Sequence, residues 1–183
     1  EPYDHPGSKA LMAADLGPSI GFYHQRRDLL RDAEVIADVA VLRSFPSQVF
    51  GGGPNAQLTN QVEQALIASR GAFQIIYDHQ LDDLRRYRAL VLAGCTAMGD
   101  QQLEQIRRYV DAGGRVCVVG PVATHDAWNR PRAKPGLDDL PAARVVRIGT
   151  QDDPLAAVRR ACDDAPSVEI DGPHGLCAEV TQQ

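Results

Sequence analysis

The two residues in this sequence best suited to catalysis are Cys95 and His125, since a thiol beside an imidazole can act as a nucleophile. A nucleophile elbow has the form G-x-C-x-G on a tight turn between a strand and a helix. The segment AGCTAMGD has no glycine two positions after Cys95, and no His-x-Glu pair marks a later strand. We therefore expect Cys95 to pack at a strand end, and catalysis by Cys95 with His125 is the alternative.

A second cluster, formed by His125, Asp126, Trp128 and Arg130, has side chains suited to recognition. An indole ring can stack on a sugar face, while carboxylate and guanidinium groups hydrogen-bond to hydroxyls. The simpler interpretation is a surface loop that one buried tryptophan holds in place. In the functional alternative, the loop contacts another part of the same polypeptide or a neighbouring subunit.

The three glycines at 51–53 could present bare backbone amides to an anion. No Lys-Ser or Lys-Thr pair follows them, as a phosphate-binding P-loop would require, so a flexible loop is the simpler interpretation. The five histidines are scattered and none pairs with another at helical spacing. We predict no metal site and no cofactor.

The four cysteines include no CxxC pair, which disfavours a zinc ribbon or a redox dithiol. We read Cys95, Cys117, Cys162 and Cys177 as reduced. Cys117 lies in an apolar segment and Cys162 on the apolar stripe of a predicted helix, so we expect both to be buried as small hydrophobic residues.

Composition limits the classes of partner. The net charge of -5 argues against binding to a nucleic-acid backbone, which requires clustered lysine and arginine. No apolar run approaches the roughly 20 residues of a membrane span, and EPYDHPGSKA lacks the pattern of a signal peptide. We expect a soluble, cytoplasmic protein that binds neither nucleic acid nor membranes.

The elements that must position these residues alternate between short β-branched segments and helical patterns, which is typical of an α/β fold with a parallel sheet. Five strands are predicted, at 39–42, 73–77, 89–93, 116–119 and 144–148. Helices are predicted between them, one capped by Asp100 and ended by Gly113, and a last one capped by Asp153. The segments SFPSQVFGGGPN and ATHDAWNRPRAKPGLDDLP are predicted as irregular loops.

Two flanking regions do not follow this pattern. Residues 1–36 read as two helical segments broken at Gly17 and Pro18. The segment SVEIDGPHGLCAEV alternates like a hairpin with its turn near Gly172 and Pro173. The sequence therefore suggests a helical lead-in at 1–36, an α/β domain at 37–165 and the start of a β-rich domain at 166–183.

The segment YRALVLAGCTAMGDQQLEQIRRYVDAGGRVCVVG resembles the middle domain of the bacterial β-galactosidases that assemble as trimers, and ADVAVLRSFPS is similar to its opening strand. The resemblance implies a flavodoxin-like three-layer sandwich with a five-stranded parallel sheet, of the class I glutamine-amidotransferase-like kind. MAADLGPSIGFYHQRRDLL looks like the helix that leaves the catalytic barrel in that family, and the terminal hairpin looks like the start of its C-terminal β-sandwich.

In that family the barrel carries the two catalytic glutamates. The resemblance therefore implies a noncatalytic structural or oligomerisation domain of a glycoside-hydrolase-like protein acting in carbohydrate metabolism. Its implied partners are the barrel of the same polypeptide and further copies in a homo-oligomer. An independent cysteine hydrolase or amidotransferase-like enzyme and a domain that binds a small molecule such as a carbohydrate remain alternatives.

A ligand or interface site is expected at the carboxyl ends of the strands, where the winding of an open parallel sheet reverses. With the flavodoxin-like order this point lies between the first and third predicted strands. The candidate residues for a ligand or interface loop are Phe45, Ser47, Gly52, Thr96, His125, Asp126, Trp128 and Arg130.

Overall fold

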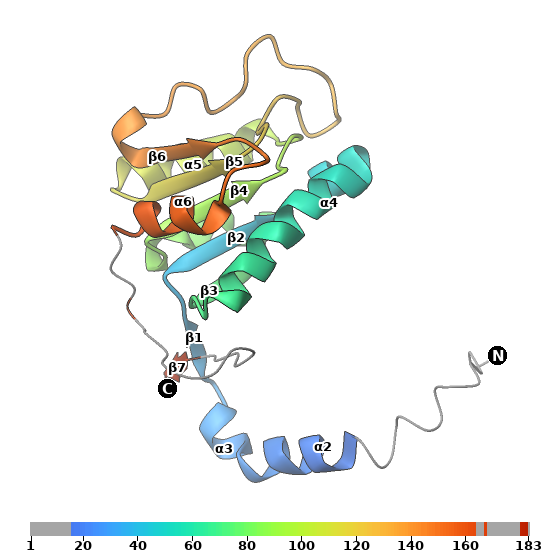
Figure 1. Cartoon of the computed structure of the whole chain (residues 1–183), viewed down its shortest axis with the longest axis vertical. Coiled ribbons are helices and arrows are strands. Elements are labelled where there is room, and N and C mark those ends of the chain that lie inside the picture. The colour runs from blue at the N-terminus through green and yellow to red at the C-terminus, as the bar shows by residue number, and fades with distance from the viewer. Residues whose placement is uncertain (1–15, 164–166, 168–179, 183) are drawn as a thin grey trace, which may run out of the picture. The chain divides into compact units, whose positions relative to one another are not determined.

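The structure, a computed structural model, describes residues 16–163, 167 and 180–182 (Figure 1). The chain divides into two compact units. The smaller unit comprises Glu1–Val35 with Thr181–Gln183, and the larger one is Ile36–Val180. Within the described residues, no helix has both the length and the apolar character needed to cross a membrane.

The smaller unit contains two helices, α2 (Leu16–Gln25) and α3 (Arg27–Leu30), which are separated at Arg26. Gly17 and Pro18, where a break between two helical segments was predicted, lie in the first turn of α2, and the first of those segments lies outside the described residues. A proline is tolerated there, since the amides of the first turn have no partner within the helix.

Strand β1 (Glu34–Ile36) pairs with β7 (Val180–Gln182) in a two-stranded sheet. The hairpin predicted within 167–180 lies almost entirely outside the described residues. The pairing of β1 with β7 was not foreseen, since the sequence gives no signal that matches a short strand near the start of the chain to one near its end.

The larger unit is built on a parallel sheet of five strands in the order β3-β2-β4-β5-β6. This confirms the predicted α/β class and the five parallel strands, with boundaries that differ by one residue at three strand ends. The strands are β2 (Val39–Arg43), β3 (Phe73–Tyr77), β4 (Ala89–Ala93), β5 (Arg115–Val119) and β6 (Val145–Ile148).

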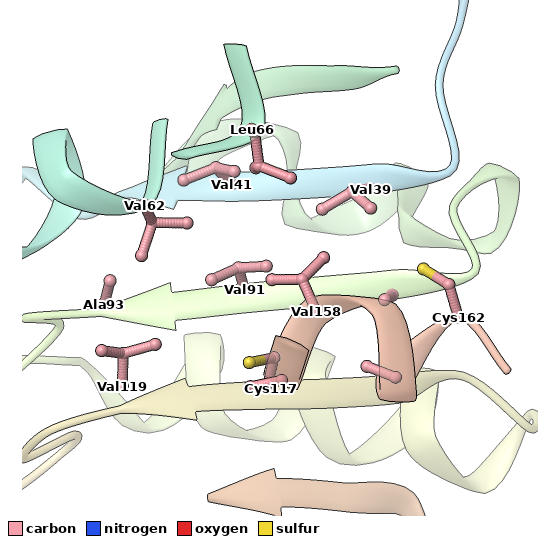
Figure 2. Packing of buried hydrophobic residues seen from close by; sticks show 13 residues of the cluster. Val39, Val41, Val62, Leu66, Val91, Ala93, Cys117, Val119, Val158 and Cys162 are labelled. Carbon is pink, nitrogen blue, oxygen red and sulfur yellow. The ribbon is translucent and has the colours of Figure 1, made fainter. Parts of the chain in front are cut away.

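Helices cover both faces of this sheet, with α4 and α6 on one side and α5 on the other (Figure 1). Successive side chains of a strand point to opposite faces, so β4, which is buried throughout, must be covered on both sides. On the face of α4 and α6, Val41 and Val91 pack with Val158 (Figure 2). Cys117 and Cys162 lie in the same cluster, which confirms their predicted burial.

Helix α5 (Asp100–Asp111) buries the predicted stripe on the other face, through Leu103, Ile106 and Val110. The predicted cap, Asp100, is wrong, because the N-cap residue is Gly99. The Gly99 amide donates a hydrogen bond of 2.6 Å to Oε1 of Gln102. The Gln102 side chain, rather than that of Asp100, therefore pairs with a free amide at the start of the helix.

Helix α4 (Phe45–Ala68) corrects the loop predicted for SFPSQVFGGGPN. The helix begins at Phe45, kinks at Gly52 and continues through Pro54. The glycine has φ 56 and ψ −143, a conformation that essentially only glycine adopts. Pro54 therefore lies near the start of the second helical section, where it does little harm.

Two shorter elements complete the unit. The helix predicted before β4 is a 3-10 helix, η1 (Asp78–Arg86). Helix α6 (Pro154–Ala161) has the predicted cap, since Asp153 Oδ1 accepts a hydrogen bond of 2.9 Å from the Leu155 amide. A short 3-10 helix, η2 (Ala142–Arg144), precedes β6.

Candidate functional site

The carboxyl ends of β2 and β4, where a ligand site was expected, are joined by buried hydroxyl groups. Ser47 donates a hydrogen bond of 2.8 Å from Oγ to the Ala97 carbonyl and accepts one of 2.9 Å from the Ala97 amide. Ser44 Oγ lies 3.2 Å from the same carbonyl oxygen. Because these bonds pair polar groups within the fold, Ser47 holds the start of α4 against the segment that follows β4.

Asn55 extends this contact along α4. Its amide nitrogen donates hydrogen bonds to the Ser47 carbonyl at 2.9 Å and to Thr96 Oγ1 at 2.7 Å. Gly94 has φ +65, and a Cβ atom at this position would lie 2.5 Å from the Asn55 carbonyl oxygen. Among the described residues, no buried side-chain nitrogen or oxygen lacks a hydrogen-bond partner. The buried polar side chains at the ends of β2 and β4 are therefore paired within the fold, and Thr96 contributes to holding α4 in place.

Cys95 is buried in the same region, with 1% of its surface exposed. Its Sγ atom lies 3.7 Å from the carbonyl oxygens of Leu42 and Ala93. Burial raises the pKa of this thiol to about 12. The imidazole of His125 is engaged elsewhere, with Nδ1 2.9 Å from Thr124 Oγ1. This arrangement keeps the thiol protonated and gives it backbone carbonyls, rather than a base, as hydrogen-bond partners.

The loop after β5 displays Trp128 to solvent. Asp126 Oδ1 accepts hydrogen bonds from the amides of Trp128 at 2.8 Å and Arg130 at 2.9 Å. The Arg130 amide is the main cause that lowers the pKa of the Asp126 carboxyl. Trp128 is 75% exposed, so the simpler interpretation, in which a buried tryptophan holds the loop in place, is wrong about this side chain. A fixed turn that presents a large exposed ring is suited to contact with another surface.

The loop that contains Trp128 and the start of α4 are attached to the same segment, residues 94–99. Met98 donates its amide hydrogen bond to the His125 carbonyl at 3.1 Å, and the His125 amide donates to Thr96 at 3.0 Å. Ala97, between them, bonds to Ser47 of α4. The structure therefore attaches the predicted residues of the loop after β5 and those of α4 to one segment at the carboxyl ends of the strands. Among the predicted residues of α4, Ser47 is buried.

The outer surface of α4 is uncharged and partly apolar. Phe45 is 70% exposed, and Val49 and Phe50 are also exposed. The only charged residue of this 24-residue helix is Glu63, which is buried and paired with Arg43 Nε at 2.7 Å. We call six of its exposed positions the α4 surface: Phe45, Val49, Phe50, Gln57, Gln61 and Gln64.

Val49, Phe50 and the glutamines of the α4 surface were not among the predicted site residues. A usable signal was present, because the sequence from 45 to 68 holds one charged residue while 23% of the whole chain is charged. The interpretation of 44–55 as a loop hid it, since the stretch was not recognised as one helix. Gly52, in contrast, was a predicted site residue, and its role in the structure is the kink in α4.

No family model matches the sequence, and no curated protein sequence matches it. Among solved structures, the chain is similar to a β-galactosidase from Bacillus circulans sp. alkalophilus, with a TM-score of 0.54 and 18% identity over 62% of this chain and 18% of that one. It is also similar to an exo-carrageenase of family GH42 from Bacteroides ovatus, with a TM-score of 0.54 and 14% identity over 68% of this chain and 18% of that one.

A β-galactosidase from the psychrophilic Marinomonas ef1 shows a TM-score of 0.52 and 13% identity, over 66% of this chain and 20% of that one. The chain thus spans about a fifth of the length of these similar proteins. At such low identity the likeness establishes the fold alone. Over roughly two thirds of its length, the chain therefore has the fold of one part of larger glycoside-hydrolase chains.

Proposed function

We propose that this chain is a noncatalytic structural domain of a longer glycoside-hydrolase-like polypeptide, and that it helps to hold copies of that polypeptide in a homo-oligomer. The similar solved structures support the first part, since the chain corresponds to a fraction of each of them. The strand order β3-β2-β4-β5-β6 supports a flavodoxin-like, class I glutamine-amidotransferase-like classification.

The α4 surface is the observation that carries the oligomerisation proposal. The buried cores of protein interfaces are depleted of charged residues, and aromatic side chains contribute much of the binding energy there. The α4 surface has both properties, with exposed Phe45 and Phe50 and no exposed charge. Three glutamines on the same helix can satisfy polar groups of a partner without the cost of desolvating an ion.

Trp128 supplies a second contact in this proposal. Its loop is fixed by Asp126, so that little conformational freedom is lost when the ring is covered. We assign this contact to the barrel of the same polypeptide or to a neighbouring copy. The protonated, buried thiol of Cys95 supports a domain without catalytic activity of its own.

The oligomerisation proposal is tested on the longer natural polypeptide by sedimentation velocity. The double variant Phe45→Ser with Phe50→Ser should shift the assembly to smaller species at concentrations where the wild type remains assembled. Gln101→Ser with Glu104→Ser is the matched control, because both residues are exposed on helix α5. An unchanged assembly in the phenylalanine variant would contradict the role of α4 in oligomerisation.

The absence of catalysis is tested on this chain alone. The purified chain should not hydrolyse aryl galactosides, whereas the longer polypeptide should hydrolyse an aryl glycoside. Hydrolysis by the chain alone, lost on replacement of Cys95 or His125, would instead support the cysteine-dependent alternative.

A further inference from the structure

Three neighbouring strands begin at arginine residues. Arg88 immediately precedes β4, Arg115 is the first residue of β5, and Arg144 immediately precedes β6. Arg115 lies opposite Arg144, because Val116 pairs with Val145, and Arg88 is one position removed from Arg115, because Ala89 pairs with Arg115. We call these three residues the arginine row. It lies at the amino ends of the strands, the opposite edge from the start of α4.

The arginine row places like charges on adjacent strands. Neighbouring strands are about 5 Å apart, and like charges directly opposite each other destabilise a sheet. Arg115 forms an ion pair with Asp163, and Arg88 Nη1 lies 3.9 Å from Asp38 Oδ1. For Arg144 the structure shows a hydrogen bond of 2.8 Å to the Gly113 carbonyl. The positive charge of the arginine row is therefore only partly neutralised by these acidic partners.

A pocket of about 630 Å³ opens beside the arginine row and has Arg85 as a fourth arginine in its lining. Four arginines and one lining aspartate, Asp163, give a local formal charge of +3, and inclusion of Asp38 leaves +2. This charge contrasts with the net charge of -5 for the chain. The pocket is thus a local concentration of positive charge with room for a small molecule.

The lining of the pocket includes the ring of Tyr109 and the backbone around Gly114. A Cβ atom on Gly114 would lie 2.3 Å from the Tyr109 ring. The ring can therefore pack against the backbone here only because residue 114 is a glycine. The phenol donates a hydrogen bond of 3.2 Å to the Tyr87 carbonyl, and burial raises its pKa. Tyr109 therefore remains neutral and does not oppose the positive charge.

We propose that this pocket binds an oxyanion, a phosphate or sulfate group, either free or carried by a saccharide. Guanidinium groups present paired N–H donors that match the oxygens of such anions. Arg85 forms no hydrogen bond or ion pair with the described residues, and the bond of Arg144 to Gly113 uses one of its five N–H donors. These two exposed arginines can turn toward an anion without loss of an ion pair.

The test uses isothermal titration calorimetry of the whole chain in buffer of low chloride content. Inorganic phosphate should bind, and the variant Arg85→Gln with Arg144→Gln should weaken its affinity at least about tenfold. The control variant Arg108→Gln with Lys134→Gln removes the same charge at exposed positions outside the pocket and should bind as the wild type does. The single variant Arg85→Gln gives a second measurement that leaves the bond between Arg144 and Gly113 intact.

Further titrations identify the source of the anion. Inorganic sulfate, a hexose 6-phosphate and the uncharged hexose are compared with inorganic phosphate. Tighter binding of the hexose phosphate indicates an anion carried by a saccharide, and equal binding indicates a free anion. Failure of the wild type to bind any of these anions at about 10 mM, equal affinities in the pocket and control variants, or equal binding of the uncharged hexose would overturn the proposal.

Discussion

Replacement of Gly94 by alanine tests whether α4 and the end of β4 are locked together. Gly94 has φ +65, and the added Cβ would approach the Asn55 carbonyl oxygen to 2.5 Å. That oxygen cannot easily withdraw, because it accepts a hydrogen bond of 3.1 Å from Thr59 Oγ1. The same Thr59 hydroxyl is bonded to the Ala93 carbonyl at 2.8 Å, so movement of α4 would disturb both bonds.

The expected loss combines two effects. A left-handed backbone conformation costs an alanine about 1–2 kcal/mol. Forcing an extra carbon into a packed site costs about 1–3 kcal/mol more. Gly94→Ala should therefore reduce the free energy of unfolding by about 2–5 kcal/mol, a large part of the roughly 5–15 kcal/mol typical of a domain.

Gly113→Ala is the matched control. Gly113 also has a positive φ, +102, but a Cβ atom there would have no heavy atom within 4 Å. Urea unfolding followed by circular dichroism should show that Gly94→Ala is the less stable variant by about 1–3 kcal/mol. Equal losses in the two variants would refute the reasoning, since strain alone would then explain both.

Three further predictions concern single side chains. Iodoacetamide at pH 8 should label Cys95 as slowly as buried Cys117, because burial raises the pKa of each thiol to about 12; peptide mass mapping that found Cys95 labelled much faster would contradict this. Trp128, the one tryptophan of the sequence, should be quenched by acrylamide almost as well in the folded as in the unfolded chain, and Trp128→Ala should change the free energy of unfolding by less than about 0.5 kcal/mol. The lowered pKa of Asp126 means that its carboxylate stabilises the loop above its ordinary pKa of 3.8 and loses this effect as pH falls through the folded value; an NMR titration midpoint at or above 3.8 would be the opposite result.

The strands were predictable because their signal is local. Segments such as Ala89–Ala93 are short, apolar and bounded by glycine or charged residues, which suits a buried parallel strand. The buried cysteines followed from the same pattern. The start of α4 was not predictable from local rules, since glycine and proline usually interrupt helices. Tertiary hydrogen bonds from Ser47 to Ala97 and from Asn55 to Thr96, which the sequence does not reveal, stabilise that segment in helical form.

The site was predictable in part. The sequence placed Trp128 and Asp126 in one loop, but the exposure of the ring follows from the turn that Asp126 closes. The arginine row was missed because residues 88, 115 and 144 are far apart in sequence and meet only through the strand register. The repeated pattern of an arginine before an apolar segment, in RALVLA, RVCVV and RVVRI, is the signal that could have revealed it.

The kink at Gly52 separates the first turns of α4 from the rest of the helix. The turns that precede it carry Val49 and Phe50 outward, while Ser47 anchors them inward through Ala97. Substitutions at Val49 and Phe50 therefore leave the sheet, the bonds between Ser47 and Ala97, and the kink at residue 52 unchanged. The side chains at these two positions can therefore change without a change in the contacts that attach this part of α4 to the rest of the domain.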